Sequence, residues 1–119
     1  MTPAITSGCT AVVTGAASGI GLAAARALAA RGMAVALLDL AGPALDRAAT
    51  IPGARAYPTD VADAAAIAAT AARVAAEMPP VTVLMNNAGM GVPSSTLAGA
   101  EAWTRTLNVN LWGIIHGTM

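Results

Sequence analysis

Short apolar runs alternate along the chain with longer stretches in which apolar residues recur every three or four positions. A short run of aliphatic residues bounded by polar or glycine-rich sequence is typical of a β-strand, and the longer spacing is typical of a helix. The runs predict four strands, at Thr10–Val13, Met33–Leu38, Ala54–Pro58 and Val81–Met85. The last run is almost wholly apolar, as in strands that are buried on both faces.

Helical spacing follows each of these runs. The predicted helices are Gly19–Ala30, Pro43–Ala49, a third from the N-cap Asp63 through Glu77, and a last helix or pair of helices from near Ala100 onward. The expected apolar faces are Ile20, Ala24 and Leu28 in the first helix, and Ile67, Ala71, Val74 and Met78 in the third.

This alternation predicts the α/β class, with a doubly wound parallel sheet covered by helices on both faces. No repeat, linker or charge run divides the chain, so we expect one domain over residues 1–119. Because crossovers between parallel strands are right-handed, the carboxyl ends of the strands lie along one edge, where ligands bind in sheets of this kind. The residues that follow the strands are polar or glycine-rich: Thr14-Gly15, Asp39, Asp60 and Asn86–Gly89.

Charge and hydropathy narrow the classes of partner. Six arginines balance six acidic residues, lysine is absent and the net charge is zero, so the chain has no electrostatic footprint for nucleic acid or an anionic membrane. No run approaches the roughly 18 apolar residues of a membrane-spanning helix, and the first residues do not resemble a signal peptide. With one cysteine, and so no internal disulfide, the chain is expected in the cytoplasm.

The candidate chemistry begins with TGAASGIG, residues Thr14–Gly21, where three glycines follow the first strand directly. Gly15 permits a sharp turn, Gly19 the close approach of a ligand, and Gly21 tight packing of the helix on the strand. The unsatisfied amides at the start of the helix attract a pyrophosphate. The spacing is GxxxGxG rather than GxGxxG, and a plain strand-to-helix turn can also contain such glycines. No Lys-Ser or Lys-Thr follows, which argues against a phosphate-hydrolysing P-loop.

Asp39 ends the second predicted strand, where an acid can hydrogen-bond the hydroxyls of an adenosine ribose. A carboxylate there repels a 2′-phosphate, and neither Ser18 nor Leu40 supplies the basic group that such a phosphate needs. The alternative is an exposed acid at a strand end that binds nothing. Beside the glycine loop, Asp39 favours NAD over NADP as the cofactor.

Four motifs together resemble the short-chain dehydrogenase/reductase family: TGAASGIG (Thr14–Gly21), Asp60-Val61, NNAG (Asn86–Gly89) and NVNLWG (Asn108–Gly113). They occur in the family's order and spacing over nearly the whole chain. The resemblance implies a Rossmann-type sheet with strand order 3-2-1-4. It also implies an NAD(P)-dependent oxidoreductase, which moves a hydride between the nicotinamide cofactor and a small-molecule alcohol or carbonyl.

The resemblance further implies ten cofactor-binding residues and no metal site. The ten are Gly15, Ser18, Gly19 and Ile20 at the pyrophosphate, Asp39 at the adenine ribose, Asp60 and Val61 beside the adenine, and Asn87, Ala88 and Gly89 beneath the ribose on the nicotinamide side. In the catalytic set it implies Asn110, whose backbone carbonyl in a distorted helix would hold a water of the proton relay.

The rest of the family's catalytic set has no counterpart among the 119 residues. Its serine, and the tyrosine and lysine of its YxxxK motif, come after the segment that NVNLWG resembles. The only tyrosine, Tyr57, lies at the third predicted strand, and without lysine nothing can lower a tyrosine pKa in the family's manner. We therefore expect the cofactor-binding portion of a dehydrogenase, inactive by itself.

The resemblance also implies a homo-oligomer, because the helix that contains NVNLWG forms a subunit interface in the family. Strand Val81–Met85 is central in the family but would be a sheet edge here. Two other functions stay open. The chain could be a non-catalytic module that binds a dinucleotide or a partner protein, or an S-adenosylmethionine methyltransferase, which shares the glycine turn and the acid after the second strand. NNAG and NVNLWG argue against the methyltransferase.

Overall fold

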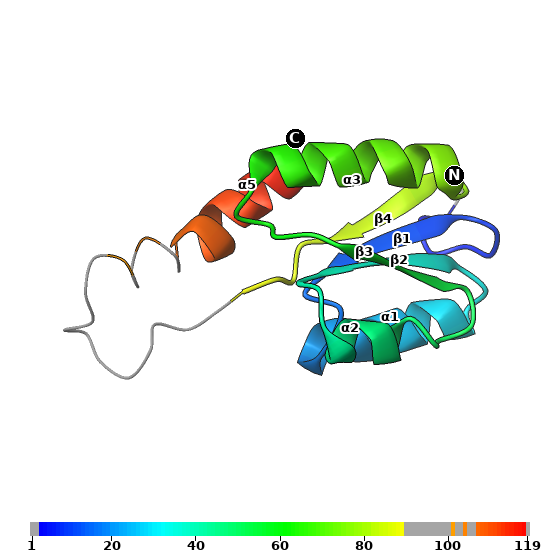
Figure 1. The fold of residues 1–119 in the computed structure, drawn as a ribbon. Helices are drawn as coiled ribbons and strands as arrows, with labels where there is room; N and C mark the ends of the chain where they lie inside the picture. The colour runs from blue at the N-terminus through cyan, green and yellow to red at the C-terminus, as the bar shows by residue number, and fades with distance from the viewer. Residues whose placement is uncertain (1–2, 90–100, 102–103, 105–106, 119) are drawn as a thin grey trace.

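The computed structural model describes residues 3–89, 101, 104 and 107–118, and strands and helices alternate along them (Figure 1). The elements are β1 (Thr10–Thr14), α1 (Gly19–Ala30), β2 (Ala34–Asp39), α2 (Pro43–Ala48), β3 (Ala54–Pro58), α3 (Ala64–Glu77), β4 (Val81–Met85), the π-helix η1 (Asn108–Trp112) and α5 (Gly113–Thr118). The predicted bounds of the first seven elements are confirmed to within one residue. The predicted start of the last helix, near Ala100, lies outside the described residues.

The four strands form one parallel sheet in the order β3-β2-β1-β4, which confirms the predicted fold class and strand order. Strand β1 pairs with β2 from Thr10 opposite Ala34 to Thr14 opposite Leu38. The carboxyl ends of β1 and β2 are therefore level, and the glycine loop and Asp39 leave the sheet side by side.

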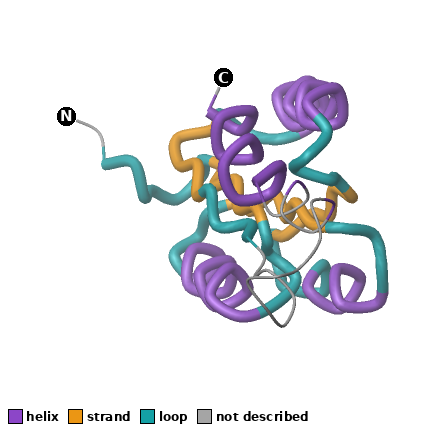
Figure 2. Tube along the Cα trace, turned by 90° about the vertical axis from the view of Figure 1, so that its left-hand side faces the viewer, coloured by secondary structure: helices purple, strands orange, loops and turns teal. Residues whose placement is uncertain are grey.

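Helices cover both faces of the sheet, α1 and α2 on one and α3 and α5 on the other (Figures 1 and 2). Under α1 and α2 the core includes Val13, Val35 and Leu37 from the sheet. Between the sheet and α3 it includes Tyr57 of β3 and Val74 of α3. Burial of aliphatic side chains on both faces of β2 is the reason that its sequence reads as a continuous apolar run.

The buried faces of two helices differ from the predicted faces. In α1 the buried residues are Gly21, Ala25 and Leu28, whereas Ile20 is 74% exposed, so the predicted stripe was wrong by one position at its start. In α3 Thr70 is buried between Ile67 and Val74, and Ala71, which was predicted to face the core, is exposed. An apolar stripe that consists largely of alanine is too weak a signal to predict the rotation of a helix from its sequence.

Asp63 caps α3 as predicted, because its carboxylate accepts the backbone N–H of Ala66 at 3.1 Å. Strand β4 pairs only with β1 and forms one edge of the described sheet. Val81 and Leu84 are 46% and 42% exposed, so the prediction of an edge is confirmed and that of burial on both faces is wrong. Among the described helices, none has the length and apolar character to cross a membrane.

Candidate functional site

A hollow of about 120 Å³ lies at the carboxyl edge of the sheet, where five chain segments meet. Its lining residues are Gly15, Asp39, Leu40, Thr59, Asp60, Val61, Ala88, Gly89 and Val109. Six of the ten residues expected to hold the cofactor are among them. The carboxyl ends of the strands are the place where open parallel sheets bind ligands.

The glycine loop lies against the NNAG segment with no space for side chains. Gly15 has a φ of +65°, and a Cβ there would lie 2.9 Å from the Cα of Ala88. A Cβ on Gly21 would overlap the carbonyl oxygen of Gly15 and lie 2.6 Å from Nδ2 of Asn87. Only glycine at these two positions lets the loop and the first turn of α1 pack against the end of β4.

The residues at the very start of α1 are exposed to solvent. Ser18, Gly19 and Ile20 are exposed, and the Ser18 side chain makes no capping hydrogen bond. The N-terminal amides of a helix have no partners within the helix, and the helix dipole makes this end electropositive. These three residues were expected at the pyrophosphate; they follow Gly15 along the chain but do not line the hollow.

Thr14 connects the end of β1 to NNAG. Its hydroxyl oxygen accepts the backbone N–H groups of Asn87 and Ala88, each at 2.9 Å. The Asn87 side chain in turn donates to the carbonyl of Gly15 at 3.4 Å. These bonds hold the segment after β4 beside the glycine loop without any strand pairing.

Asp39 is half-buried, and its carboxylate has two backbone partners. Oδ2 accepts the N–H of Ala17 in the glycine loop at 2.9 Å, and Oδ1 accepts the N–H of Leu40 at 2.8 Å. Each carboxylate oxygen keeps a second lone pair, so both can still accept a hydroxyl donor from the hollow. The acid is therefore oriented before a ligand arrives.

The segment after β3 also lines the hollow, through Thr59, Asp60 and Val61. Asp60 accepts the N–H of Ala62 at 2.9 Å through its carboxylate, which turns the chain into α3. Val61 is buried and packs against Ile67 and Val109. This contact brings the π-helix η1 to the hollow.

Asn110 lies within η1, in the wider turn that interrupts the regular helical hydrogen bonds. It is exposed, and its Oδ1 would lie 3.4 Å from a Cβ built on Gly89. The structure thus brings the residue expected to be catalytic next to the end of NNAG. π-Helical turns occur often at functional sites because they redirect one backbone carbonyl.

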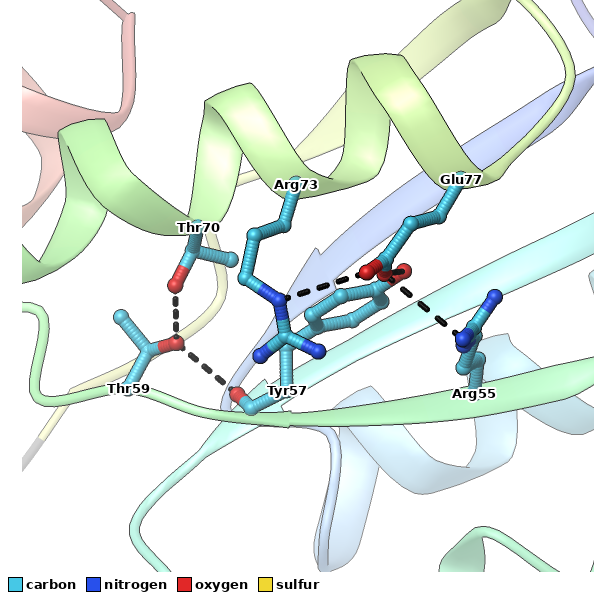
Figure 3. A network of polar contacts seen from close by, with 6 residues as sticks. All are labelled: Arg55, Tyr57, Thr59, Thr70, Arg73 and Glu77. Carbon is cyan, nitrogen blue, oxygen red and sulfur yellow. Dashed lines mark hydrogen bonds and ion pairs between the residues drawn. The ribbon is translucent and has the colours of Figure 1, made fainter.

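Three lining residues were not among the predicted site residues: Leu40, Thr59 and Val109. Each directly precedes or follows a predicted one along the chain, and that adjacency is the signal that could have found them. Tyr57 lies elsewhere, buried under α3, where its hydroxyl donates to Glu77 at 2.8 Å (Figure 3). Burial, and then this hydrogen bond, raise the pKa of Tyr57. Within the described residues no cluster of three or more His, Cys, Asp or Glu could hold a metal ion.

A sequence model of the family described as short chain dehydrogenase matches residues 9–119. The cis-4-hydroxycyclohexanecarboxylate dehydrogenase of Sinomonas cyclohexanicum is 46% identical over 110 residues, which are 87% of this chain and 44% of that protein. The chain thus spans less than half the length of this relative.

Solved structures give the same result. A short chain dehydrogenase/reductase from Burkholderia phymatum in complex with NAD superposes with a TM-score of 0.87 at 34% identity, over 94% of this chain and 42% of that one. The 3-ketoacyl-(acyl-carrier-protein) reductase from Brucella melitensis, complexed with NADH, does so with a TM-score of 0.87 at 30% identity, over 94% and 48%. The four motifs, the strand order and these matches agree: the chain belongs to the short-chain dehydrogenase family.

Proposed function

We propose that residues 1–119 form the cofactor-binding Rossmann domain, incomplete relative to the family, of an NAD-dependent oxidoreductase. The enzyme would act on a small-molecule alcohol or carbonyl and assemble as a homo-oligomer in the cytoplasm. NAD supplies the chemistry of hydride transfer at its nicotinamide ring. The residues of this chain bind and orient it.

The observation that carries the choice of NAD is the position of Asp39 at the hollow. Its carboxylate lies at the end of β2 with a free lone pair on each oxygen, which suits the two hydroxyls of an adenosine ribose. None of the lining residues in the described part of the chain is basic. A 2′-phosphate would therefore meet a carboxylate with no cation to offset the repulsion.

The remaining roles follow the chain along the sheet edge. Asp60, Val61 and Leu40 would enclose the adenine. The first turn of α1, with Ser18, Gly19 and Ile20, would hold the pyrophosphate through backbone amides. Asn87, Ala88 and Gly89 would lie beneath the second ribose, and the nicotinamide would then lie toward Asn110. The complexes of two similar proteins with NAD and NADH support a nicotinamide cofactor at this site.

Calorimetric titration with NAD and NADP tests the proposal. We expect NAD to bind more tightly than NADP, and S-adenosylmethionine to raise the Tm of the chain less than NAD does. Preference for S-adenosylmethionine would favour the methyltransferase instead. NAD binding without hydride transfer, in any longer polypeptide that contains this sequence, would favour the non-catalytic binding module.

A further inference from the structure

Two buried threonine hydroxyls meet between the end of β3 and the middle of α3. The Oγ1 atoms of Thr59 and Thr70 lie 2.8 Å apart, and the two residues are only 5% and 7% exposed (Figure 3). Thr59 directly precedes Asp60 and lines the hollow. A buried hydroxyl pair at this position links the helix to the strand end that borders the candidate adenine site.

The direction of the hydrogen bonds follows from counting protons. Thr59 Oγ1 donates its single proton to the carbonyl oxygen of Tyr57 at 2.8 Å. The contact between the two hydroxyls must then be a bond from Thr70 to Thr59, because a hydroxyl has one donor and two acceptor positions. Thr70 thus donates to Thr59, which donates to the backbone of β3.

The same residue is bonded to the neighbouring strand. The backbone N–H of Thr59 donates to the carbonyl oxygen of Asp39 at 2.7 Å, one residue beyond the last pair of the β2–β3 ladder. The carboxylate of Asp39 accepts the N–H of Ala17. A continuous series of bonds therefore runs from α3 through Thr59 and Asp39 to the glycine loop.

We propose that the Thr59–Thr70 pair is a positioning device for the adenosine end of the cofactor site. Thr70 fixes Thr59, Thr59 fixes the backbone of Asp39, and Asp39 holds the glycine loop and presents its carboxylate to the ribose. Neither threonine needs to touch the reacting atoms. The part of the inference that concerns a ligand rests on the proposed function; the part that concerns Asp39 and the loop does not.

The test compares Thr70→Val with a control variant in which another buried threonine is replaced by valine. Thr70 also lines an apolar cavity with Ile67 and Val74, so valine is expected to be tolerated there. Thr10→Val is the control: Thr10 is fully buried and its hydroxyl donates to the carbonyl of Pro79 at 2.7 Å, at the amino end of the sheet. Thr70→Ser restores the hydroxyl.

Two readouts are measured well below the Tm of each variant. The first is amide hydrogen exchange at Thr59 and Ala17, which needs no ligand. The second is the affinity for AMP, the adenosine half of NAD. For Thr70→Val we expect faster exchange at both amides and AMP binding weaker by about two- to tenfold, which is the value of one neutral hydrogen bond. Thr70→Ser should recover both, and Thr10→Val should change neither.

Unchanged exchange at Thr59 and Ala17 in Thr70→Val would overturn the inference, as would equal effects of Thr10→Val or failure of Thr70→Ser to recover the protection. Faster exchange in a chain whose wild type binds neither AMP nor NAD would uphold the link from Thr70 to Asp39 and refute the proposed function. Faster exchange with unchanged AMP affinity would refute the positioning of the ligand.

Discussion

The carboxylate of Asp39 accepts the backbone N–H of Ala17 at 2.9 Å, across 22 residues of chain. The bond joins the end of β2 to the middle of the glycine loop, so the acid expected to recognise the ribose also orders the loop expected to receive the pyrophosphate. A substitution at Asp39 should then affect two contacts with the cofactor at once.

Replacing Asp39 with alanine should weaken NAD binding and narrow the difference between NAD and NADP. A hydrogen bond to a charged group contributes roughly 1.5–3 kcal/mol, which corresponds to about ten- to a hundredfold in affinity. Calorimetry on Asp39→Ala measures both affinities. Asp46→Ala removes an acid of α2 that does not line the hollow and is the matched control. Equal NAD affinity of wild type and Asp39→Ala, or a wild type that prefers NADP, would contradict the assignment.

Replacing two glycines of the same motif with alanine, one at a time, should lower the Tm by different amounts. A Cβ on Gly21 would overlap the carbonyl oxygen of Gly15, so Gly21→Ala must move the loop or the helix. Gly19 has a φ of +56° but open space around its Cβ position, so Gly19→Ala costs only backbone strain of about 1–2 kcal/mol. Thermal unfolding should show a larger loss of Tm for Gly21→Ala. A larger loss for Gly19→Ala would mean that the loop rearranges freely around position 21.

The parts of the fold that could be predicted from the sequence are those with a local or periodic signal. Continuous aliphatic runs gave β1 and β2, and Asp63 before an alanine-rich stretch gave the start of α3. Motif spacing gave the residues at the carboxyl edge. The rotation of α1 was wrong because its stripe of Ile20, Ala24 and Leu28 has only two large side chains, and the close packing of Gly21 on Gly15 determines the rotation instead.

The remaining features depend on contacts between side chains far apart in the sequence. Such contacts produce no local or periodic pattern from which a single sequence could predict them. The bond from Tyr57 to Glu77 and the hydroxyl pair of Thr59 and Thr70 exist only because α3 crosses β3 at one particular register. Threonine is not an apolar residue and does not count toward the apolar pattern that predicts the buried face of a helix. Thr70 was therefore not among the predicted core residues.

The Tyr57–Glu77 pair predicts a pH dependence of stability. The hydrogen bond from Tyr57 is the main cause of the lowered pKa of Glu77, with Arg73 and Arg55 adding favourable charge at 3.5 and 3.7 Å. A carboxyl whose pKa is lower in the folded state stabilises the fold above its ordinary pKa of 4.5, and this stabilisation is lost as the pH falls through the folded value. Tyr57, whose pKa is raised, stabilises the fold below 10 and loses this effect at higher pH.

Tyr57→Phe should therefore lower the Tm at neutral pH, and the difference from wild type should shrink both in acid, as Glu77 is protonated, and in strong base, as Tyr57 ionises. Thermal unfolding of both proteins from about pH 3 to about pH 11, a range that includes the ordinary pKa values of glutamate and tyrosine, measures this difference in Tm. Thr10→Val loses a buried hydroxyl bonded to a carbonyl and should show a difference that does not vary with pH. A Tyr57→Phe difference that is equally constant would show that the pair contributes packing alone.

A polypeptide of residues 1–119 should not catalyse hydride transfer on an alcohol or ketone. The one tyrosine of the sequence, Tyr57, is buried and hydrogen-bonded to Glu77, and its pKa is raised, whereas an activated acid–base tyrosine has a lowered pKa. The sequence contains no lysine that could lower it. General acid–base groups contribute roughly 10²–10⁴-fold, so rates should be near background. NAD reduction that scales with chain concentration through repeated purification would disprove this, and Tyr57→Phe would show whether Tyr57 is responsible.

The edge strand β4 leads to the last prediction. It carries no charged residue, its Val81 and Leu84 are exposed, and an apolar cavity of about 200 Å³ opens beside it, lined by both of them and by Val12 and Val74. Natural sheet edges are protected by charge, proline or short length, and an unprotected apolar edge pairs with another chain. Helix α5, which lies on the same face of the sheet as α3 (Figure 1), contributes the exposed Ile114.

We therefore expect the 119-residue chain to self-associate, and Leu84→Lys to suppress this, because a lysine on an edge strand places a charge where a second strand would dock. Ala72→Lys adds the same charge on the exposed surface of α3, and the chain with this substitution should associate as the wild type does. Size-exclusion chromatography with light scattering, from micromolar to near-millimolar concentration, distinguishes the variants. A sharp wild-type peak at 11.6 kDa throughout would show that β4 does not recruit a second chain, and equal suppression by both lysines would assign the effect to net charge instead of the edge.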